Sequence, residues 1–118
     1  MADQWIIYHN PRCSKSRATM AILEEAGVEP QVVEYLKQAP TAVELEGLFK
    51  KLGREPQTVM RFGESVARAL GLSKNDQRSR QEWIQLIVDN PILLERPIVV
   101  RGDQARLGRP PETVRELL

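Results

Sequence analysis

The order of apolar patterns along the chain limits its fold more than any single residue does. A short run rich in β-forming residues at Gln4–Tyr8 is followed by a helical pattern at Ser14–Ala26 and a second β-type run at Pro30–Leu36. Gly27 provides a stop signal for the helix. Because this helix is long enough to cross over between two strands, the first third of the chain predicts a strand–helix–strand unit.

The middle of the chain carries helix signals only. Thr41 with Glu44, and Ser79 with Glu82, have the spacing of capping boxes, in which two residues satisfy each other's backbone amides at a helix start. The first helix is expected to end at Gly53 and the second at Asn90-Pro91. Between them, Pro56–Leu70 is expected to be helical with an interruption at Gly63.

The last part of the chain returns to strand patterns. Pro97–Arg101 is expected to be a strand, Gly102-Asp103 a tight turn and Gln104–Leu107 the returning strand of a hairpin, with a helix at Pro111–Leu118. The expected order is β-α-β, then helices, then β-β-α. We therefore predict one domain over residues 1–118, of the α/β class with a small mixed sheet and a helical insertion at about residues 41–91.

Charge and composition exclude several functions. The 17 Lys and Arg against 16 Asp and Glu give a net charge of +1, which disfavours broad electrostatic binding of nucleic acid. One Cys and one His cannot form an internal disulfide or a Cys/His zinc site, so no bound metal or cofactor is expected. The start of the chain shows no targeting pattern, and no apolar run has the length of a membrane span. We expect a cytoplasmic protein without a membrane partner.

The one cysteine lies where the first strand meets the first helix, in the segment His9-Asn10-Pro11-Arg12-Cys13-Ser14-Lys15-Ser16-Arg17. Amides at a helix start and nearby cations favour a thiolate there, and the same groups can bind a tetrahedral oxyanion. The sequence therefore predicts a nucleophilic Cys13 beside an oxyanion site. The alternative is a buried, inert Cys13, which its polar neighbours disfavour. His9 is either a support for the thiolate or an ordinary turn residue.

The spacing of this segment excludes two known kinds of cysteine site. Phosphatase loops separate Cys from Arg by five residues, whereas three residues separate Cys13 from Arg17. A thioredoxin-type site needs a second Cys where Ser16 stands. Any second thiol must therefore come from another molecule.

Arginine is concentrated in the second half of the chain. Nine of the 12 Arg lie in residues 61–118, and guanidinium groups bind oxyanions well. Arg96 precedes Pro97 at a strand start, and Arg109 precedes two prolines after the hairpin. Each is a candidate oxyanion ligand, although a single Arg is more often a solvated surface residue.

Three motifs in order resemble the glutaredoxin-dependent arsenate reductases and the related Spx-type regulators over essentially the whole chain. They are the segment from Tyr8 to Arg17, the segment Asn90-Pro91-Ile92-Leu93-Leu94-Glu95-Arg96-Pro97-Ile98-Val99-Val100, and Arg106-Leu107-Gly108-Arg109-Pro110. The resemblance implies a thioredoxin-like fold in which Pro97 is the cis-proline opposite the active cysteine. Its reductase members imply that the chain is an enzyme, an arsenate reductase.

The resemblance assigns roles to particular residues. It implies that Cys13 attacks arsenate, that His9 and Ser16 support this nucleophile, and that the oxyanion is held by Arg61, Arg96 and Arg109. Phe62 follows Arg61, where the family more often has a Lys or a polar residue.

The resemblance further implies that glutathione, as co-substrate, and glutaredoxin, as partner, complete the reduction of arsenate to arsenite. Two other functions remain open at this point. One is a Spx-type regulator that binds RNA polymerase; Ser16 in place of a second Cys argues against a redox switch of the Spx kind, but not against such binding. The other is a glutathione-linked oxidoreductase with a different substrate.

Overall fold

The computed structural model describes residues 4–118. Residues 1–3, which contributed to the expectation about targeting, lie outside the described part. The chain forms two compact units, one made of residues up to 38 together with 96–118, and the other of residues 39–95. We call them unit 1 and unit 2. The bounds of unit 2 are similar to those of the helical insertion expected at about residues 41–91. That the whole chain is one domain stays a prediction.

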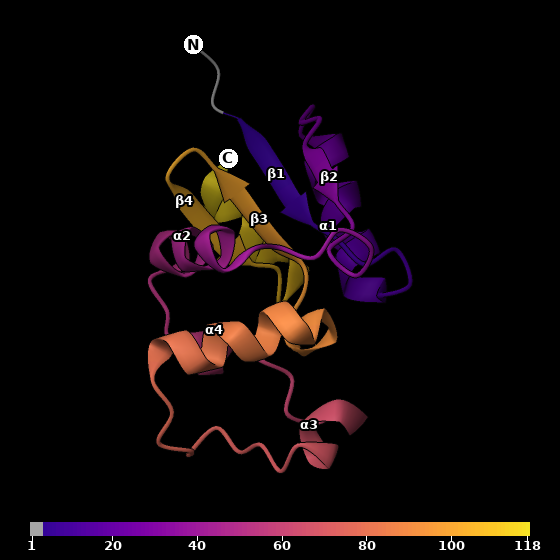
Figure 1. Cartoon of the computed structure of the whole chain (residues 1–118). Coiled ribbons are helices and arrows are strands. Elements are labelled where there is room, and N and C mark those ends of the chain that lie inside the picture. The colour runs from indigo at the N-terminus through magenta and orange to yellow at the C-terminus, as the bar shows by residue number, and fades with distance from the viewer. Residues whose placement is uncertain (1–3) are drawn as a thin grey trace. The chain divides into compact units, whose positions relative to one another are not determined.

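Unit 1 contains a four-stranded mixed sheet in the order β2-β1-β3-β4 (Figure 1). β2 runs parallel to β1, whereas β3 is antiparallel to both β1 and β4. The mixed sheet predicted from the sequence is therefore confirmed, with a shorter second strand than expected. The strands are β1 (Trp5–Tyr8), β2 (Gln31–Val33), β3 (Ile98–Arg101) and β4 (Gln104–Leu107).

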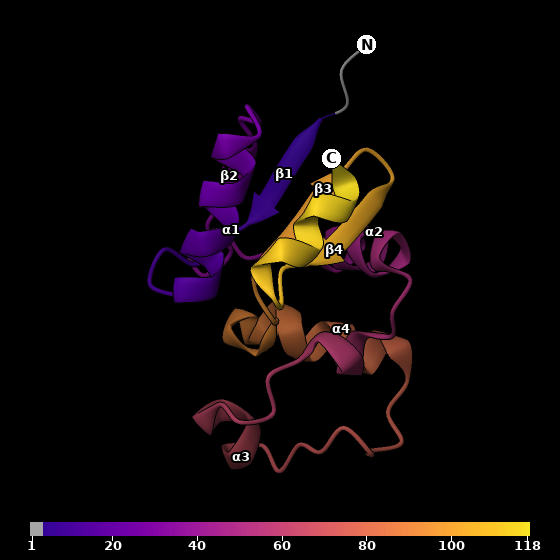
Figure 2. The same cartoon turned by 180° about the vertical axis from the view of Figure 1, so that it is seen from behind.

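Helix α1 (Ser14–Glu25) and a C-terminal 3-10 helix (Pro111–Leu117) pack against each other beside this sheet (Figure 2). Ile7 and Val99 are paired in neighbouring strands, so their side chains point to the same face. The core on that face is made by buried side chains from the sheet and both helices: Ile7, Leu23, Val99, Val114 and Leu117. The C-terminal helix predicted from Pro111 is present, in the tighter 3-10 form that short terminal helices often take.

Both ends of α1 follow from the sequence. Cys13 is the N-cap residue, with an extended backbone and no side-chain cap. At the other end, Gly27 has φ +77° and Val28 donates its amide hydrogen to the Leu23 carbonyl at 2.9 Å, which is a Schellman arrangement. A residue other than Gly would be strained at position 27. The helix is therefore fixed at the end opposite Cys13.

Unit 2 is helical, with α4 packed against α2 and against two 3-10 turns. Both predicted capping boxes are present: Glu44 donates its amide hydrogen to Thr41 Oγ1 at 3.1 Å, and Glu82 does the same to Ser79 Oγ at 3.1 Å. The helices are α2 (Ala42–Leu52), α3 (Ser65–Ala69) and α4 (Arg80–Asp89), and the 3-10 turns are Pro56–Val59 and Pro91–Leu93. None of the helices in residues 4–118 has both the length and the apolar content to cross a bilayer.

The helix expected over Pro56–Leu70 is interrupted earlier than the sequence indicates. After the turn at Pro56–Val59 the chain is extended at Met60, and α3 begins only at Ser65. Arg61 donates its amide hydrogen to the Leu93 carbonyl at 2.7 Å, and Glu95 donates its own to the Val59 carbonyl at 2.9 Å. These long-range hydrogen bonds replace helical ones, and sequence spacing cannot reveal them.

Truncating the core should destabilise unit 1 in a position-dependent way. Leu23 is fully buried, so Leu23→Ala should lower the free energy of unfolding by about 2–5 kcal/mol through lost burial and a remaining cavity. Leu36, which is 44% exposed, is the matched control, and Leu36→Ala should cost less than about 1 kcal/mol. Urea unfolding followed by circular dichroism measures both, and equal losses would contradict this core assignment.

Candidate active site

The loop between β1 and α1 places the Cys13 sulfur at the helix start. Cys13 donates its amide hydrogen to the Asn10 carbonyl at 3.0 Å, and Arg12 donates its own to Asn10 Oδ1 at 3.0 Å. These two bonds, both to Asn10, fold residues 10–13 into a tight turn. Arg17 then donates to the Cys13 carbonyl at 3.0 Å as the first bond of the helix. The thiol is partly exposed and lies next to the free amides of the first helical turn.

Four groups stabilise the thiolate form of Cys13. Burial is the largest single effect and by itself raises the pKa of the thiol, but the Ser16 amide, the Arg96 side chain and the Lys15 amide together lower the pKa below its ordinary value of 9.0. Arg109 adds a fourth group, with Nη2 3.8 Å from Sγ. The predicted proximity of Cys13 to a helix start and to arginines is therefore present in the structure.

Arg96 and Arg109 reach the sulfur from adjacent backbone segments. Arg109 Nε donates to the Arg96 carbonyl at 2.8 Å, and the Gly108 amide donates to the Pro97 carbonyl at 2.8 Å. The Arg96–Pro97 peptide bond is cis, as the resemblance implied. Two guanidinium groups beside one sulfur can bind an oxyanion through several charge-assisted hydrogen bonds.

His9 and Ser16 form a hydrogen-bonded pair next to the Cys13 loop. His9 Nδ1 lies 2.6 Å from Ser16 Oγ, and the Asn10 amide donates to the same oxygen at 3.0 Å. Ser16 is completely buried. Its hydroxyl therefore holds the loop, whereas its backbone amide acts on the sulfur. This arrangement brings both predicted supporting residues to the site.

The His9 ring is neutral at neutral pH. Burial lowers its pKa below the ordinary 6.5, and nearby Arg17 also lowers it, against an opposing effect of Glu34. A positive charge on His9 is consequently not available to the thiolate near pH 7. The ring instead contributes a hydrogen-bonding nitrogen to Ser16.

Arg61 belongs to unit 2, where it contacts two carboxylates. Its Nε donates to Glu64 at 2.9 Å and its Nη1 donates to Glu95 at 2.8 Å. Burial opposes a higher pKa, but these two carboxylates outweigh it and raise the pKa of Arg61. Two of its nitrogens are thus already engaged, and its role as an oxyanion ligand stays a prediction. Phe62, the departure from the family pattern, packs edge-on against the Trp83 ring at 5.9 Å between centroids.

Asn10 was not singled out by the sequence. It is 93% buried, and it serves the loop through its side chain, its carbonyl and its amide. The Asn-Pro pair signalled a turn, but nothing in the spacing indicated that one residue would hold both Cys13 and Ser16. The role of Asn10 depends on how the turn at residues 10–13 folds onto the start of α1.

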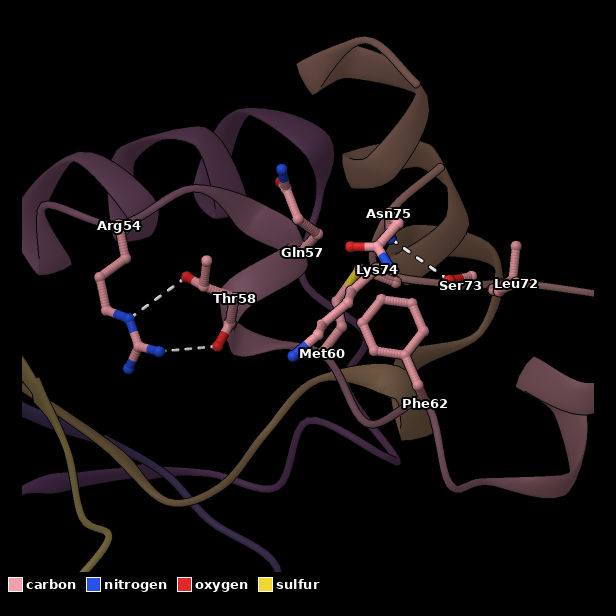
Figure 3. A pocket seen from close by; sticks show the side chains of 9 residues that line it. All are labelled: Arg54, Gln57, Thr58, Met60, Phe62, Leu72, Ser73, Lys74 and Asn75. Carbon is pink, nitrogen blue, oxygen red and sulfur yellow. Dashed lines mark hydrogen bonds between the residues drawn. The ribbon is translucent and has the colours of Figure 1, made fainter. Parts of the chain in front are cut away.

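In the described part of the chain, each of the two units has cavities of its own. A hollow of about 250 Å³ adjoins the Cys13 loop in unit 1 and is lined by His9, Asn10, Pro11, Arg12, Glu34, Leu36 and Lys37. A larger one of about 860 Å³ lies in unit 2, where Arg54 donates to Thr58 Oγ1 and to the Thr58 carbonyl (Figure 3). None of the predicted site residues lines the larger cavity. Within residues 4–118, no cluster of three or more His, Cys, Asp or Glu could hold a metal ion.

Comparison with known proteins agrees with this geometry. The model of the ArsC family matches residues 8–117, which includes Cys13, both arginines at the sulfur and Pro97. The chain belongs to the ArsC family. The chain is 49% identical to the uncharacterized protein YfgD of Escherichia coli, over all of this chain and 99% of that protein.

Other relatives have functional names. An arsenate reductase of Haemophilus influenzae is 45% identical over 96% of this chain and 97% of its own length. A solved structure of an arsenate reductase from Vibrio cholerae is 45% identical, covers both chains completely and has a TM-score of 0.93. These comparisons confirm the resemblance to arsenate reductases, and the thioredoxin-like α/β fold that it implied is confirmed with it.

Removing the Arg109 side chain should make the thiolate form of Cys13 less stable relative to the neutral thiol in this ArsC-family protein. Without the guanidinium 3.8 Å from Sγ, Arg109→Gln should raise the pKa of Cys13 and move the pH profile of iodoacetamide alkylation to higher pH. Arg106→Gln is the matched control, because Arg106 contacts Glu116 instead, at 2.9 Å. Equal profiles for Arg109→Gln and the wild type would contradict a role for Arg109 at the sulfur.

Proposed function

We propose that this protein reduces arsenate to arsenite, with Cys13 as the nucleophile and with glutathione and glutaredoxin as the sources of electrons. The single observation that carries the proposal is the sulfur site: one partly exposed thiolate receives two helix amides and lies beside Arg96 and Arg109. A nucleophile and an oxyanion-binding group are thereby combined at one point. The arsenate reductases of Haemophilus influenzae and Vibrio cholerae support this choice of oxyanion.

In the first step the Cys13 thiolate attacks arsenic. A sulfur–arsenic bond forms and an arsenic–oxygen bond breaks, and the oxygen leaves as water after taking up a proton. Arsenic stays in the +5 state. Arg96 and Arg109 neutralise charge on the remaining oxygens, because guanidinium groups pair with oxyanions in a planar, bidentate manner.

Two outside thiols then reduce the adduct. Glutathione displaces a second oxygen as water, so that arsenic is bound to both Cys13 and the glutathione sulfur. The glutaredoxin thiolate attacks the glutathione sulfur, a disulfide forms between them, and the electron pair of the broken sulfur–arsenic bond reduces arsenic to the +3 state. Water replaces Cys13 on arsenic, arsenite leaves and the thiolate is restored.

The chain's own composition supports the proposed dependence on outside thiols. Cys13 is its one cysteine, and the position three residues later holds Ser16, whose hydroxyl is already used by His9 and Asn10. No resolving thiol exists within the chain. We therefore also propose a cytoplasmic location, since glutathione and reduced glutaredoxin are supplied in reducing compartments.

Arg61 is proposed as a third ligand of the oxyanion. Arsenate would compete with Glu64 and Glu95 for its guanidinium, so binding there depends on the exchange of one ion pair for another. His9 and Ser16 are proposed to keep the loop in the geometry that directs amides at the sulfur. Pro97 has a structural role, through its carbonyl bond to Gly108.

A coupled assay tests the proposed reaction. Arsenate-dependent oxidation of NADPH should occur with glutathione, glutaredoxin and glutathione reductase present, and Cys13→Ser should reduce the rate roughly a thousandfold or more, because the nucleophile is lost. Omission of glutaredoxin should stop turnover after formation of the arsenic adduct. Arg106→Gln, whose side chain contacts Glu116 and not the sulfur, is the control variant and should keep the wild-type rate.

Each alternative has its own signature in the same experiment. Turnover equal to that of Cys13→Ser would reject arsenate reduction. Glutathione found on Cys13 by mass spectrometry without arsenate turnover would indicate a thiol-linked oxidoreductase with another substrate. Recovery of RNA polymerase with the purified protein, again without turnover, would indicate a Spx-type regulator.

A further inference from the structure

Position 108 favours glycine because a side chain would collide with neighbouring atoms, and not because the backbone angle φ requires glycine. Its φ is not in the positive region, so another residue could adopt its conformation. A Cβ at this buried position would, however, lie 2.7 Å from Thr19 Oγ1 and 2.8 Å from Pro97 Cγ. Both distances are well below ordinary contact, so the backbone of Gly108 touches two other segments of unit 1 directly.

One of these segments is the helix that carries the nucleophile. Thr19 is completely buried, and its hydroxyl donates to the Lys15 carbonyl at 2.9 Å. A β-branched side chain with this bond has little freedom to move aside. Lys15 lies in the first turn of α1, and its amide helps to lower the pKa of Cys13. The Thr19 hydroxyl is therefore fixed to the turn that stabilises the sulfur.

The other segment carries the arginines. Gly108 donates its amide hydrogen to the Pro97 carbonyl at 2.8 Å, and Arg109, the next residue, donates from Nε to the Arg96 carbonyl at 2.8 Å. Gly108 thus lies between Thr19 of α1 on one side and Pro97 on the other, next in sequence to Arg109 and close to the residue that follows Arg96. Through these two hydrogen bonds, a shift of Gly108 away from Thr19 would move the backbone that carries Arg96 and Arg109.

We propose that Gly108 and Thr19 are positioning residues, whose close contact sets the distance from the Cys13 sulfur to Arg96 and Arg109. The inference deepens the proposed function, because it concerns the spacing between its nucleophile and its oxyanion ligands. It explains why a glycine precedes Arg109 although no turn requires one. Gly108 touches no reacting atom and acts through its neighbours.

The test is Gly108→Ala, compared with Gly47→Ala, which introduces the same methyl group at a position with nothing within 4 Å. In Gly108→Ala the pH profile of Cys13 alkylation should move to higher pH, and arsenate kcat/KM should fall about ten- to a hundredfold. Gly47→Ala should leave both unchanged. A folded Gly108→Ala with an unchanged alkylation profile would overturn the proposal.

Thr19 variants give an independent readout. Thr19→Ala removes the oxygen nearest to the new methyl group, so in the double variant with Gly108→Ala the alkylation profile should return part of the way to the wild-type profile. Thr19→Ser keeps the hydroxyl and should behave like the wild type. Simple addition of the two single effects in the double variant would count against a direct contact.

Two further outcomes are decided by the same measurements. Should Gly108→Ala fail to fold, Thr19→Ala alone carries the test: a move of its alkylation profile to higher pH supports the proposal, and an unchanged profile overturns it. Alkylation needs no arsenate. If the wild-type protein shows no arsenate turnover but Gly108→Ala shows the expected alkylation profile, the proposed function is rejected. The positioning contact between Gly108 and Thr19 is then still supported.

Discussion

The charge state of the Cys13 sulfur is the quantity on which the proposed chemistry of this protein depends, and it is set by a balance of opposing effects. Partial burial removes water and favours the neutral thiol, whereas the amides of Ser16 and Lys15 and the Arg96 guanidinium favour the thiolate. The donors outweigh burial only while they remain close to the sulfur. The structure around the site is therefore best understood as a means of holding these donors in place.

Different parts of unit 1 perform that task. The pair of partly buried His9 and buried Ser16, joined by the Asn10 amide, holds the loop against the helix, so the amides of the first turn face the sulfur. The carbonyl of Arg96 accepts from Arg109 and so keeps the two arginines together. Since the His9 ring is neutral at neutral pH, it acts on the thiolate through geometry and not through charge.

Patterns that depend on neighbouring residues were predictable from the residues themselves, whereas contacts between distant segments were either expected only from the family resemblance, as for Arg96 and Arg109 near Cys13, or were missed. Both capping boxes, the hairpin at Gly102 and the helix start at Cys13 follow from local physical rules. The interruption after Pro56 results from hydrogen bonds to residues 93–95, and the carboxylates at Arg61 include Glu95, 34 residues away. Asn10 looked like an ordinary turn residue because its partners depend on the closed loop.

The most direct test of this account is a thiolate titration followed by absorbance at 240 nm, with Cys13→Ser subtracted to remove the tyrosines. Because Cys13 is the one cysteine, the difference reports a single group. The account predicts a midpoint below 9.0. It also predicts that the free energy of unfolding rises with pH between the lowered pKa of Cys13 in the folded protein and the ordinary value of 9.0, because Cys13 of the unfolded chain keeps its proton up to a higher pH. A midpoint at or above 9.0 would contradict it.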